Sequence, residues 1–416
     1  MTVPNAVDAT ATFQQSNVTS ISTSAAINVG DIVFDTNASA FTITPRDNFL
    51  INGSGITNNS GITQQFVCTY PAVISFFNSA GAGIRFNTFT VGGGAVSNAP
   101  GGLVRFKDGA NAGGAIFTLN GGTATGASGG KVQFNNTASA AFAILIANRG
   151  SAGGKGGLID FRGNSQGDNA LAKLFGNGTL AIDKHAAGTV LIGSIEGDGT
   201  VVLGANRLKV GINGLTTTFS GRIKDDPNGV GGSLFKSGRG MFTLAGASTY
   251  TGGTIIKQGQ FFANNSTGSA TGSGPVQVIG NGALRGNGTI AGPVTISVGD
   301  LAPGSAGVMP GHLTINNTLT FDPYSDYLVY SDTTGTLSKV TANSVTINGN
   351  VQFNILVSVT PAKGTVLTVI ENTSANPIFG TFSNLPDGST YSLSGGTTFK
   401  VNYEGGDGND LTLTVK

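Results

Sequence analysis

Carboxylates are the side chains of this sequence that could do the most demanding chemistry. Glycoside hydrolysis needs two carboxyl groups about 5–10 Å apart. The chain has 21 acidic residues among 416, and Asp160, Asp183 and Asp198 follow one another at unequal intervals. Unequal intervals do not predict a column of stacked carboxylates. The three glutamates are far apart in the sequence: Glu196, Glu371 and Glu404. We therefore predict no catalytic residues, and a polysaccharide-acting enzyme is the weakest of the functions considered below.

Histidine and cysteine offer little further chemistry. His185 and His312 are far apart in the sequence, and neither has the His-Glu-x-x-His spacing of a zinc site, so we predict surface or turn histidines. Cys68 is the only cysteine, which excludes an internal disulfide and a multi-cysteine zinc site, and we predict a small buried side chain there. Glycine runs are expected by chance in a chain with 67 glycines, so they do not indicate a dinucleotide-binding site. We therefore predict no cofactor, and the residues above predict no metal.

Two acidic segments have turn chemistry. Residues 225–229 read Asp-Asp-Pro-Asn-Gly and predict a loop. The segment from Gly405 to Asp410, followed by Leu411, resembles one calcium-binding turn of the RTX nonapeptide type. That resemblance implies calcium shared between successive repeats, whereas this chain has one copy and Thr412 in the expected apolar position. We predict a plain turn, and the sequence leaves calcium at Gly405 to Asp410 open as the alternative.

The composition excludes several classes of protein. The 22 basic and 21 acidic residues give a net charge of +1, so no basic field exists for nucleic acid. Apolar residues make up 39%, which is too many for ordinary disorder. The longest apolar run covers only positions 140–147, against about 20 residues for a spanning helix, so we expect no direct membrane insertion. The first residues lack a basic and apolar export signal, and we expect any such signal to lie elsewhere.

Short segments rich in β-branched and aromatic residues recur along the chain, each bounded by Gly, Asn, Asp or Pro. They predict many strands of about three to six residues joined by tight turns, and hence an all-β protein. The clearest segments are residues 32–34, 41–43, 190–192, 200–203, 313–315 and 319–321.

An internal repeat decides the architecture. The glycine pairs that begin at Gly101, Gly129 and Gly156 recur at a nearly constant interval of about 28 residues. Phe106, Phe134 and Phe161 recur at the same interval. A unit of this length cannot bury its apolar face alone, but stacked units can. We therefore predict a parallel β-solenoid; a sandwich or a propeller is less favoured, because a propeller blade needs about 40–50 residues.

Residues 238–254 carry the most specific motif of the chain. They read Gly-Arg-Gly-Met-Phe-Thr-Leu-Ala-Gly-Ala-Ser-Thr-Tyr-Thr-Gly-Gly-Thr. This stretch resembles the autotransporter-associated β-strand repeat, also called the passenger-associated transport repeat, with Phe242 in place of a leucine and Ser248 in place of an asparagine. The flanking segments continue the likeness over about residues 195–321, and a weaker likeness extends over most of the chain.

The resemblance implies a right-handed parallel β-helix, secreted or displayed on a bacterial surface as an autotransporter passenger. In that family a C-terminal barrel exports the passenger; we expect that barrel to be absent from this chain, because no long alternating strands follow residue 321. We expect one elongated domain with N-terminal coils at 1–83, three repeats of about 28 residues at 84–178, coils of the family repeat at 179–321, and end coils or a cap at 322–416. The residues expected to face inward are Leu284, Ile290, Val294, Ile296, Leu301, Leu313, Ile315, Leu319 and Phe321.

We therefore expect a non-catalytic, extracellular or surface-displayed solenoid that acts as a rigid stalk or adhesin. Its expected partner is a host-cell or glycan surface, since faces rich in Thr, Asn and Ser offer many weak hydrogen bonds. The alternative is a self-assembling matrix or fibre subunit, which would associate end to end through unpaired strand edges. A polysaccharide-acting enzyme ranks below both.

Overall fold

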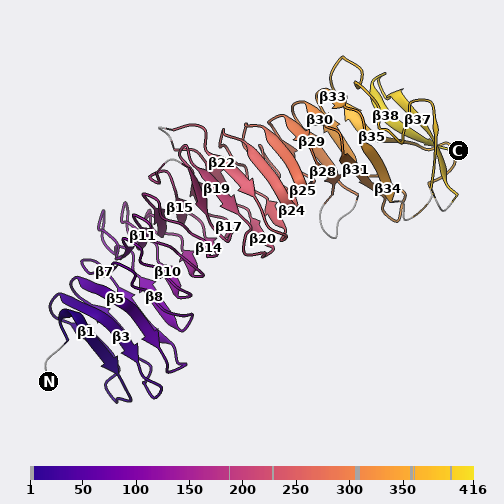
Figure 1. Ribbon diagram of the computed structural model, residues 1–416. Coiled ribbons are helices and arrows are strands. Elements are labelled where there is room, and N and C mark those ends of the chain that lie inside the picture. Colours follow the sequence, from indigo (N-terminus) through magenta and orange to yellow (C-terminus); the bar gives the residue numbers. More distant parts are fainter. Residues whose placement is uncertain are drawn as a thin grey trace. The chain divides into compact units, whose positions relative to one another are not determined.

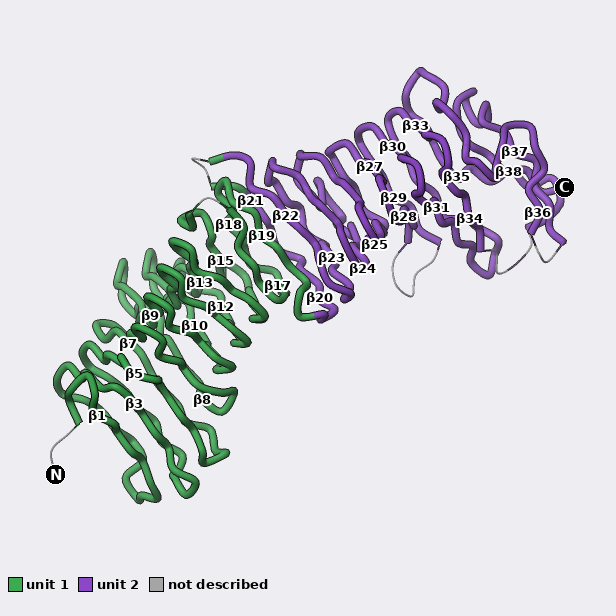
Figure 2. Tube along the Cα trace, in the orientation of Figure 1, with its two compact units in different colours: residues 1–213, 225–229 green, residues 214–224, 230–416 purple. Residues whose placement is uncertain are grey.

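The computed structural model describes residues 4–186, 188–226, 229–304, 310–356, 359, 361–393 and 396–416. Every regular element in these ranges is a β-strand (Figure 1). None of the described residues lies in a helix, so no membrane-spanning helix is found among them. The chain divides into two compact units, Met1–Asn213 with Asp225–Gly229, and Gly214–Lys224 with Val230–Lys416 (Figure 2).

The first unit is built from coils whose strands stack in parallel on the strands of the next coil (Figure 1). One sheet contains β1 (Ala6–Phe13), β3 (Ile27–Phe34), β5 (Phe49–Asn58), β7 (Val73–Phe76), β9 (Leu103–Phe106), β11 (Lys131–Phe134), β13 (Leu158–Phe161), β15 (Thr179–Ala181) and β18 (Thr200–Val202). The strands that face it are β2 (Ser20–Thr23), β4 (Thr42–Pro45), β6 (Gln64–Cys68), β8 (Asn87–Val91), β10 (Ile116–Leu119), β12 (Ile144–Ala147), β14 (Leu171–Leu174), β16 (Thr189–Leu191), β17 (Ser194–Gly197) and β19 (Arg207–Val210).

The period found in the sequence is the length of a coil. Phe106 pairs with Phe134, and Phe134 pairs with Phe161, so each phenylalanine of the repeat lies one coil from the next. Each step brings identical side chains to the same interior position, because parallel strands in register place partner residues side by side. The predicted all-β, parallel solenoid is therefore confirmed.

The interior of the first unit contains two columns of stacked phenyl rings. In one column, ring centroids lie 4.6 Å apart for Phe76–Phe106, 5.0 Å for Phe106–Phe134 and 4.8 Å for Phe134–Phe161. The other column, through Phe89 and Phe117, meets the first edge-on, as at Phe106–Phe117 with 5.7 Å between centroids. Burying each ring stabilises the fold by about 1.5–3 kcal/mol, and each aromatic pair adds about 0.5–1.5 kcal/mol.

Glycines form the corners where coils approach most closely. A Cβ on Gly101 would lie 2.3 Å from the carbonyl oxygen of Gly129, and a Cβ on Gly129 would lie 2.2 Å from that of Gly156. No side chain fits at these distances, so the recurring glycines are a packing requirement of the stacked corners. The repeated motif that revealed the period thus has a steric cause.

The second unit is also a stack of parallel coils. Its strands up to residue 356 are β20 (Thr217–Phe219), β21 (Arg222–Lys224), β22 (Ser233–Lys236), β23 (Phe242–Leu244), β24 (Thr254–Ala263), β25 (Val276–Gly286), β26 (Thr289–Ile290), β27 (Val294–Ile296), β28 (Gly299–Pro303), β29 (His312–Ile315), β30 (Leu319–Phe321), β31 (Ser325–Tyr330), β32 (Lys339–Ala342), β33 (Val345–Ile347) and β34 (Gln352–Leu356). All the residues predicted to face inward, from Leu284 to Phe321, are buried here.

Antiparallel pairing replaces parallel pairing toward the C-terminal end of the second unit. β35 (Val366–Asn372) still pairs in parallel with β32, but it is antiparallel to β38 (Asp410–Val415). β38 pairs antiparallel with β37 (Thr398–Gly405), which pairs antiparallel with β36 (Thr390–Ser392). The turn from Gly405 to Asp410 is the hairpin between β37 and β38.

Candidate functional site

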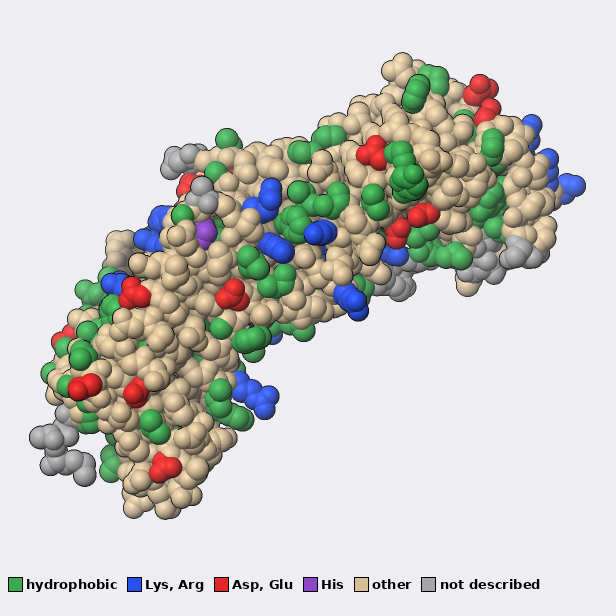
Figure 3. Space-filling view, viewed as in Figure 1, with side chains coloured by type: hydrophobic (Ala, Val, Ile, Leu, Met, Phe, Trp, Pro, Cys, Tyr) green, Lys and Arg blue, Asp and Glu red, His purple; other side chains and the backbone are tan. Residues whose placement is uncertain are grey.

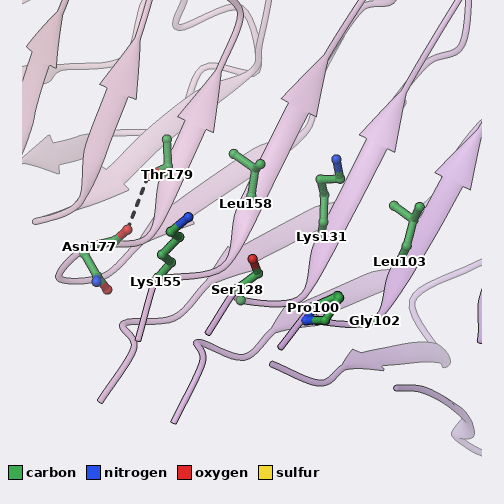
Figure 4. Close-up of a pocket in the computed structure, with 12 residues that line it drawn as sticks. Pro100, Gly102, Leu103, Ser128, Lys131, Lys155, Leu158, Asn177 and Thr179 are labelled. Carbon is green, nitrogen blue, oxygen red and sulfur yellow. Dashed lines mark hydrogen bonds between the residues drawn. The ribbon is translucent and has the colours of Figure 1, made fainter. Parts of the chain in front are cut away.

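A surface hollow lies on the first unit, over the beginnings of β9, β11, β13 and β15 (Figure 4). Its volume is about 570 Å³. We call it the basic groove, because two lysine side chains line it. The lining residues are Pro100, Gly101, Gly102, Leu103, Ser128, Gly129, Lys131, Lys155, Gly156, Leu158, Asn177 and Thr179.

Four outward side chains form a row along the groove. Leu103, Lys131, Leu158 and Thr179 are partner residues on consecutive parallel strands, and in Figure 4 they project from neighbouring strands on the same side. Neighbouring strands lie about 4.8 Å apart. The groove therefore presents an ammonium group between two apolar side chains, followed by a hydroxyl group, at regular spacing.

The hollow exists because the corner beside this row consists of glycines. Gly101, Gly129 and Gly156 occupy one stacked column in which no Cβ can be accommodated. Lys155 directly precedes Gly156, and Asn177 continues the column on the next coil, since a Cβ on Gly156 would lie 2.3 Å from the carbonyl oxygen of Asn177. Both residues are labelled in Figure 4. Asn177 is fixed by donating from Nδ2 to the carbonyl oxygen of Gly154 at 2.9 Å, which keeps this wall of the groove in place.

A cluster of charged side chains adjoins the groove on β11 and β13. The carboxylate of Asp160 is almost fully buried, with 2% exposed. It accepts a hydrogen bond from Arg162 Nε at 2.9 Å and one from Gln133 Nε2 at 2.9 Å, and Lys131 Nζ lies 3.7 Å away. On β9, the Nε of Arg105 is buried and has no hydrogen-bond partner in the described part of the chain.

Positive charge predominates around the groove. Burial lowers the pKa of Lys131; Asp160 opposes this shift, and the nearby Arg162, Arg105 and Lys184 reinforce it. The carboxylates of Asp160 and the nearby Asp183 are outnumbered by these cations, and Lys155 is a further cation in the groove wall. The result is a local excess of positive charge on a chain whose net charge is only +1, and it can attract an anionic ligand.

The sequence intervals did not reveal which acids the fold brings together. Asp160 is the strand partner of Ala181, two residues before Asp183. Burial raises the pKa of Asp183, and the carboxylates of Asp226 and Asp160 raise it further. Asp198 is not part of the pair; its Oδ1 accepts a hydrogen bond from the backbone N–H of Gly176 at 2.8 Å. The cause is coil length, because the coil from Leu158 to its partner Thr179 is shorter than the coil before it.

A carboxylate pair that sequence analysis missed lies on the second unit. Asp300 on β28 and Asp326 on β31 are partner residues on neighbouring strands. Burial raises the pKa of Asp300, the Asp326 carboxylate raises it further, and Arg285 lowers it. Asp326 Oδ1 accepts a hydrogen bond from Asn354 Nδ2 at 2.9 Å. The two acids are one coil apart in the sequence, which is the signal that could have found them.

His312 belongs to a hydrogen-bonded chain on β29, β32 and β35. Its Nε2 lies 2.7 Å from Thr341 Oγ1, which donates to Glu371 Oε2 at 2.9 Å. Lys339 Nζ also binds Glu371 Oε2, at 2.6 Å. Because the threonine proton is directed at Glu371, the histidine is the donor to Thr341 in this arrangement and does not act as a base toward it. The predicted exposed position of His312 is confirmed.

The remaining predicted residues have structural partners. His185 is partly buried, and its Nε2 lies 3.0 Å from the carbonyl oxygen of Ser165. Cys68 is fully buried, as predicted, and burial raises the pKa of its thiol. Of the acidic loop 225–229, positions 227 and 228 lie outside the described residues.

The turn from Gly405 to Asp410 is held by the protein itself. The backbone N–H of Gly408 donates to the carbonyl oxygen of Gly405 at 2.9 Å, and Asp410 Oδ1 accepts the backbone N–H of Asn372 at 2.9 Å. Among the residues that the structure describes, no group of three His, Cys, Asp or Glu side chains could hold a metal ion. Calcium at this turn stays an untested alternative.

Lys236 is a second residue that sequence analysis missed. It ends β22 with a side chain that is fully buried, and its Nζ donates to the carbonyl oxygens of Ser237, Gly238 and Gln258 at 2.9, 2.8 and 3.0 Å. Burial lowers its pKa to about 8. The ammonium group thereby joins the turn after β22 to the next coil.

Comparison with known proteins places this lysine in a recognised repeat. A family model described as Passenger-associated-transport-repeat matches residues 234–260. The chain carries a passenger-associated transport repeat. This confirms the predicted likeness to autotransporter passengers. Within the repeat, Tyr250 is fully buried and its hydroxyl lies 2.6 Å from Thr254 Oγ1.

Two curated relatives are similar to parts of this chain. The chain is 31% identical over 144 residues to the Adhesin BmaC autotransporter of Brucella suis biovar 1 (strain 1330), a match that covers 32% of this chain and 4% of that protein. It is 34% identical over 125 residues to the Extracellular serine protease of Serratia marcescens, covering 30% of this chain and 11% of that protein. The chain thus spans a small part of the length of each relative.

Proposed function

We propose that this chain is a non-catalytic passenger segment, secreted or displayed on the cell surface, that acts as a stalk or adhesin. The observation that carries the proposal is a passenger-associated transport repeat embedded in stacked parallel coils. The described coils bury most of their apolar side chains in a shared interior, and their outer faces can contact other surfaces. Its partner is a host-cell or glycan surface.

The chemistry of the outer surface supports this proposal. In Figure 3, uncharged polar side chains and backbone cover most of the visible face, with hydrophobic side chains and isolated acidic and basic groups between them. Charged residues are only 10% of the sequence. Such a surface makes many weak hydrogen bonds, each with a net value of about 0.5–1.5 kcal/mol, and adhesion results when many act together.

The proposal is tested by coating beads with the purified chain and measuring their attachment to cultured cells. We expect attachment well above that of albumin-coated beads, and competition by the free chain. Beads coated with heat-unfolded chain are the matched control, since they carry the same composition without the solenoid. Attachment no higher than that of albumin would contradict the adhesin proposal.

Surface display is tested separately in the bacterium that produces the protein. Antibodies against the chain should label intact cells, and protease added outside intact cells should remove the label. Labelling that requires permeabilised cells would refute the proposed location, whatever the outcome of the bead assay.

The carboxylate pair favours a second candidate function, cleavage of a polysaccharide. Asp300 with a raised pKa could act as an acid and Asp326 as its partner, because glycosidases use two carboxyl groups in different protonation states. Release of reducing ends from a polysaccharide panel, abolished by Asp300→Asn, would support this function. If neither the unchanged chain nor Asp300→Asn releases reducing ends faster than buffer alone, this function is excluded and the non-catalytic proposal stays in place.

A further inference from the structure

We propose that the basic groove of the first unit binds an acidic polysaccharide, a linear sugar chain with regularly spaced carboxylates. In this arrangement Lys131 and Lys155 pair with carboxylates of the sugar chain. The inference rests on the proposed adhesive function and names its ligand. It is carried by the shape of the groove, the order of its side chains and its charge.

The shape fits a linear polymer. The groove runs across four consecutive strands, β9, β11, β13 and β15, and so repeats its backbone at the strand spacing of about 4.8 Å. A stacked column of glycines forms one side of it. Since glycine carries no side chain, an extended sugar chain can approach the backbone closely there.

The order of side chains fits sugar rings that carry a charge. Lys131 lies between Leu103 and Leu158 in the row, and these apolar side chains can pack against the C–H faces of sugar rings. Thr179 and Asn177 line the same groove and can hydrogen-bond to ring hydroxyls. An apolar surface with a few oriented polar groups is the usual construction of a small-molecule or sugar site.

The charge fits carboxylates in particular. Lys131 is partly desolvated and adjoins Arg105 and Arg162, while Arg105 Nε has no hydrogen-bond partner among the described residues. A ligand carboxylate in the groove can accept from the ammonium groups of Lys131 and Lys155 in charge-assisted hydrogen bonds, and the neighbouring Arg105 and Arg162 add to the positive potential there. The ammonium group of Lys131 gains an additional counter-charge when such a ligand binds, which offsets its desolvation.

Nucleic acid fits the groove less well. None of the lining residues is aromatic, whereas single-stranded nucleic acids are bound by stacking bases on aromatic side chains. A sugar chain does not need such stacking, because its C–H faces pack against aliphatic side chains such as Leu103 and Leu158.

The test is calorimetric titration of the full chain with oligogalacturonate as the acidic polysaccharide. We expect binding that weakens as salt is raised, because surface charge pairs are screened, and no heat with neutral dextran. The double variant Lys131→Gln and Lys155→Gln should bind at least about tenfold more weakly, since each charge-assisted contact contributes enough for such a factor.

The matched control is the double variant Lys257→Gln and Lys400→Gln, which removes two exposed lysines outside the groove and should bind as the unchanged chain does. Lys131 also pairs with Asp160, so Lys155→Gln alone is measured as well; Lys155 is exposed and its removal should leave the thermal unfolding unchanged. Unaltered binding by the groove variants, equal binding of dextran, or equal binding of single-stranded DNA would each overturn the inference.

The two proposals fail in different ways. If beads carrying the chain attach to cells but the chain does not bind oligogalacturonate, the ligand inference is wrong and the adhesin proposal stands. If the chain binds oligogalacturonate through Lys131 and Lys155 but the beads attach to no cell surface, the groove assignment stands and the adhesin proposal is wrong.

Discussion

Single side chains stabilise this protein in two ways: they fill the interior, or they form hydrogen bonds with backbone groups of the turns. Lys236 does the second, because its ammonium group donates to three carbonyl oxygens of two segments. A buried charge is costly to desolvate, but removing it leaves its acceptors unpaired. Lys236 lies inside the matched repeat, so these hydrogen bonds connect two coils of that repeat.

We predict that Lys236→Met destabilises the second unit by about 2–3 kcal/mol, because three buried carbonyl oxygens lose their donor. The measurement is urea unfolding followed by circular dichroism. Lys257→Met, at an exposed lysine on the next strand, should change the unfolding free energy by less than about 0.5 kcal/mol. Equal effects of the two variants would show that the three hydrogen bonds contribute nothing.

The same lysine predicts a pH dependence. Its pKa is about 8 in the folded chain and about 10.4 when unfolded. Between these values the unfolded state binds more protons, so stability should rise with pH from about 8 to about 10.4, by up to about 3 kcal/mol. The rise should be absent in Lys236→Met. Parallel stability curves for the two proteins across this window would contradict the assigned pKa.

Which residues face the interior could be predicted from the sequence, whereas the acidic neighbours could not. Alternation within a strand fixes the inward side, and the inward residues from Leu284 to Phe321 were all predicted correctly. Neighbours across coils depend on the number of residues in each turn. Coils of unequal length occur within the first unit, so Asp183 could not be placed near Asp160 without the structure.

At the scale of the elements, the close stacking of corners requires glycine at the corner positions Gly101, Gly129 and Gly156. The glycine column permits the coils to pack at the strand spacing, and it also creates the basic groove. Sequence analysis detected the glycine pairs as a period but could not detect the groove. The groove depends on which side chains the neighbouring turns place beside the column, as Lys155 and Asn177 show.

We predict that Gly129→Ala destabilises the first unit by about 2 kcal/mol or more, since its Cβ would lie 2.2 Å from the carbonyl oxygen of Gly156 and overpacking of this kind is costly. Gly114→Ala is the control, because its Cβ would have no neighbour closer than 3.6 Å. Thermal unfolding of both variants gives the comparison. A Gly129→Ala protein as stable as the control would mean that the corners are not tightly packed.

At the scale of the whole molecule, stability is a sum over coils and their interfaces, as in other repeat proteins. The antiparallel strands within positions 366–416 are the exception to the stacking rule. They could not be predicted from the period, because strand direction depends on hairpin turns such as the one between β37 and β38.

We predict that deleting residues 103–130, one whole coil, preserves the fold. Lys131 would then follow Gly102, and β11 would pair with β7 in the register that β9 now has. Circular dichroism should retain the β spectrum and a single cooperative transition. Deleting residues 103–116, about half a coil, should abolish that transition, because inward side chains would lose their partners. Equal behaviour of the two deletions would refute stacking in register.

The stacking of one phenyl ring on another in successive coils affects how the length of such a protein can evolve. A coil that begins and ends at equivalent positions is a self-contained increment. Misaligned recombination between two copies of its coding segment would therefore lengthen or shorten the protein by a complete layer. The new layer would find a matching surface above and below it without any compensating substitution, so natural variants of this protein should differ in size by multiples of a layer.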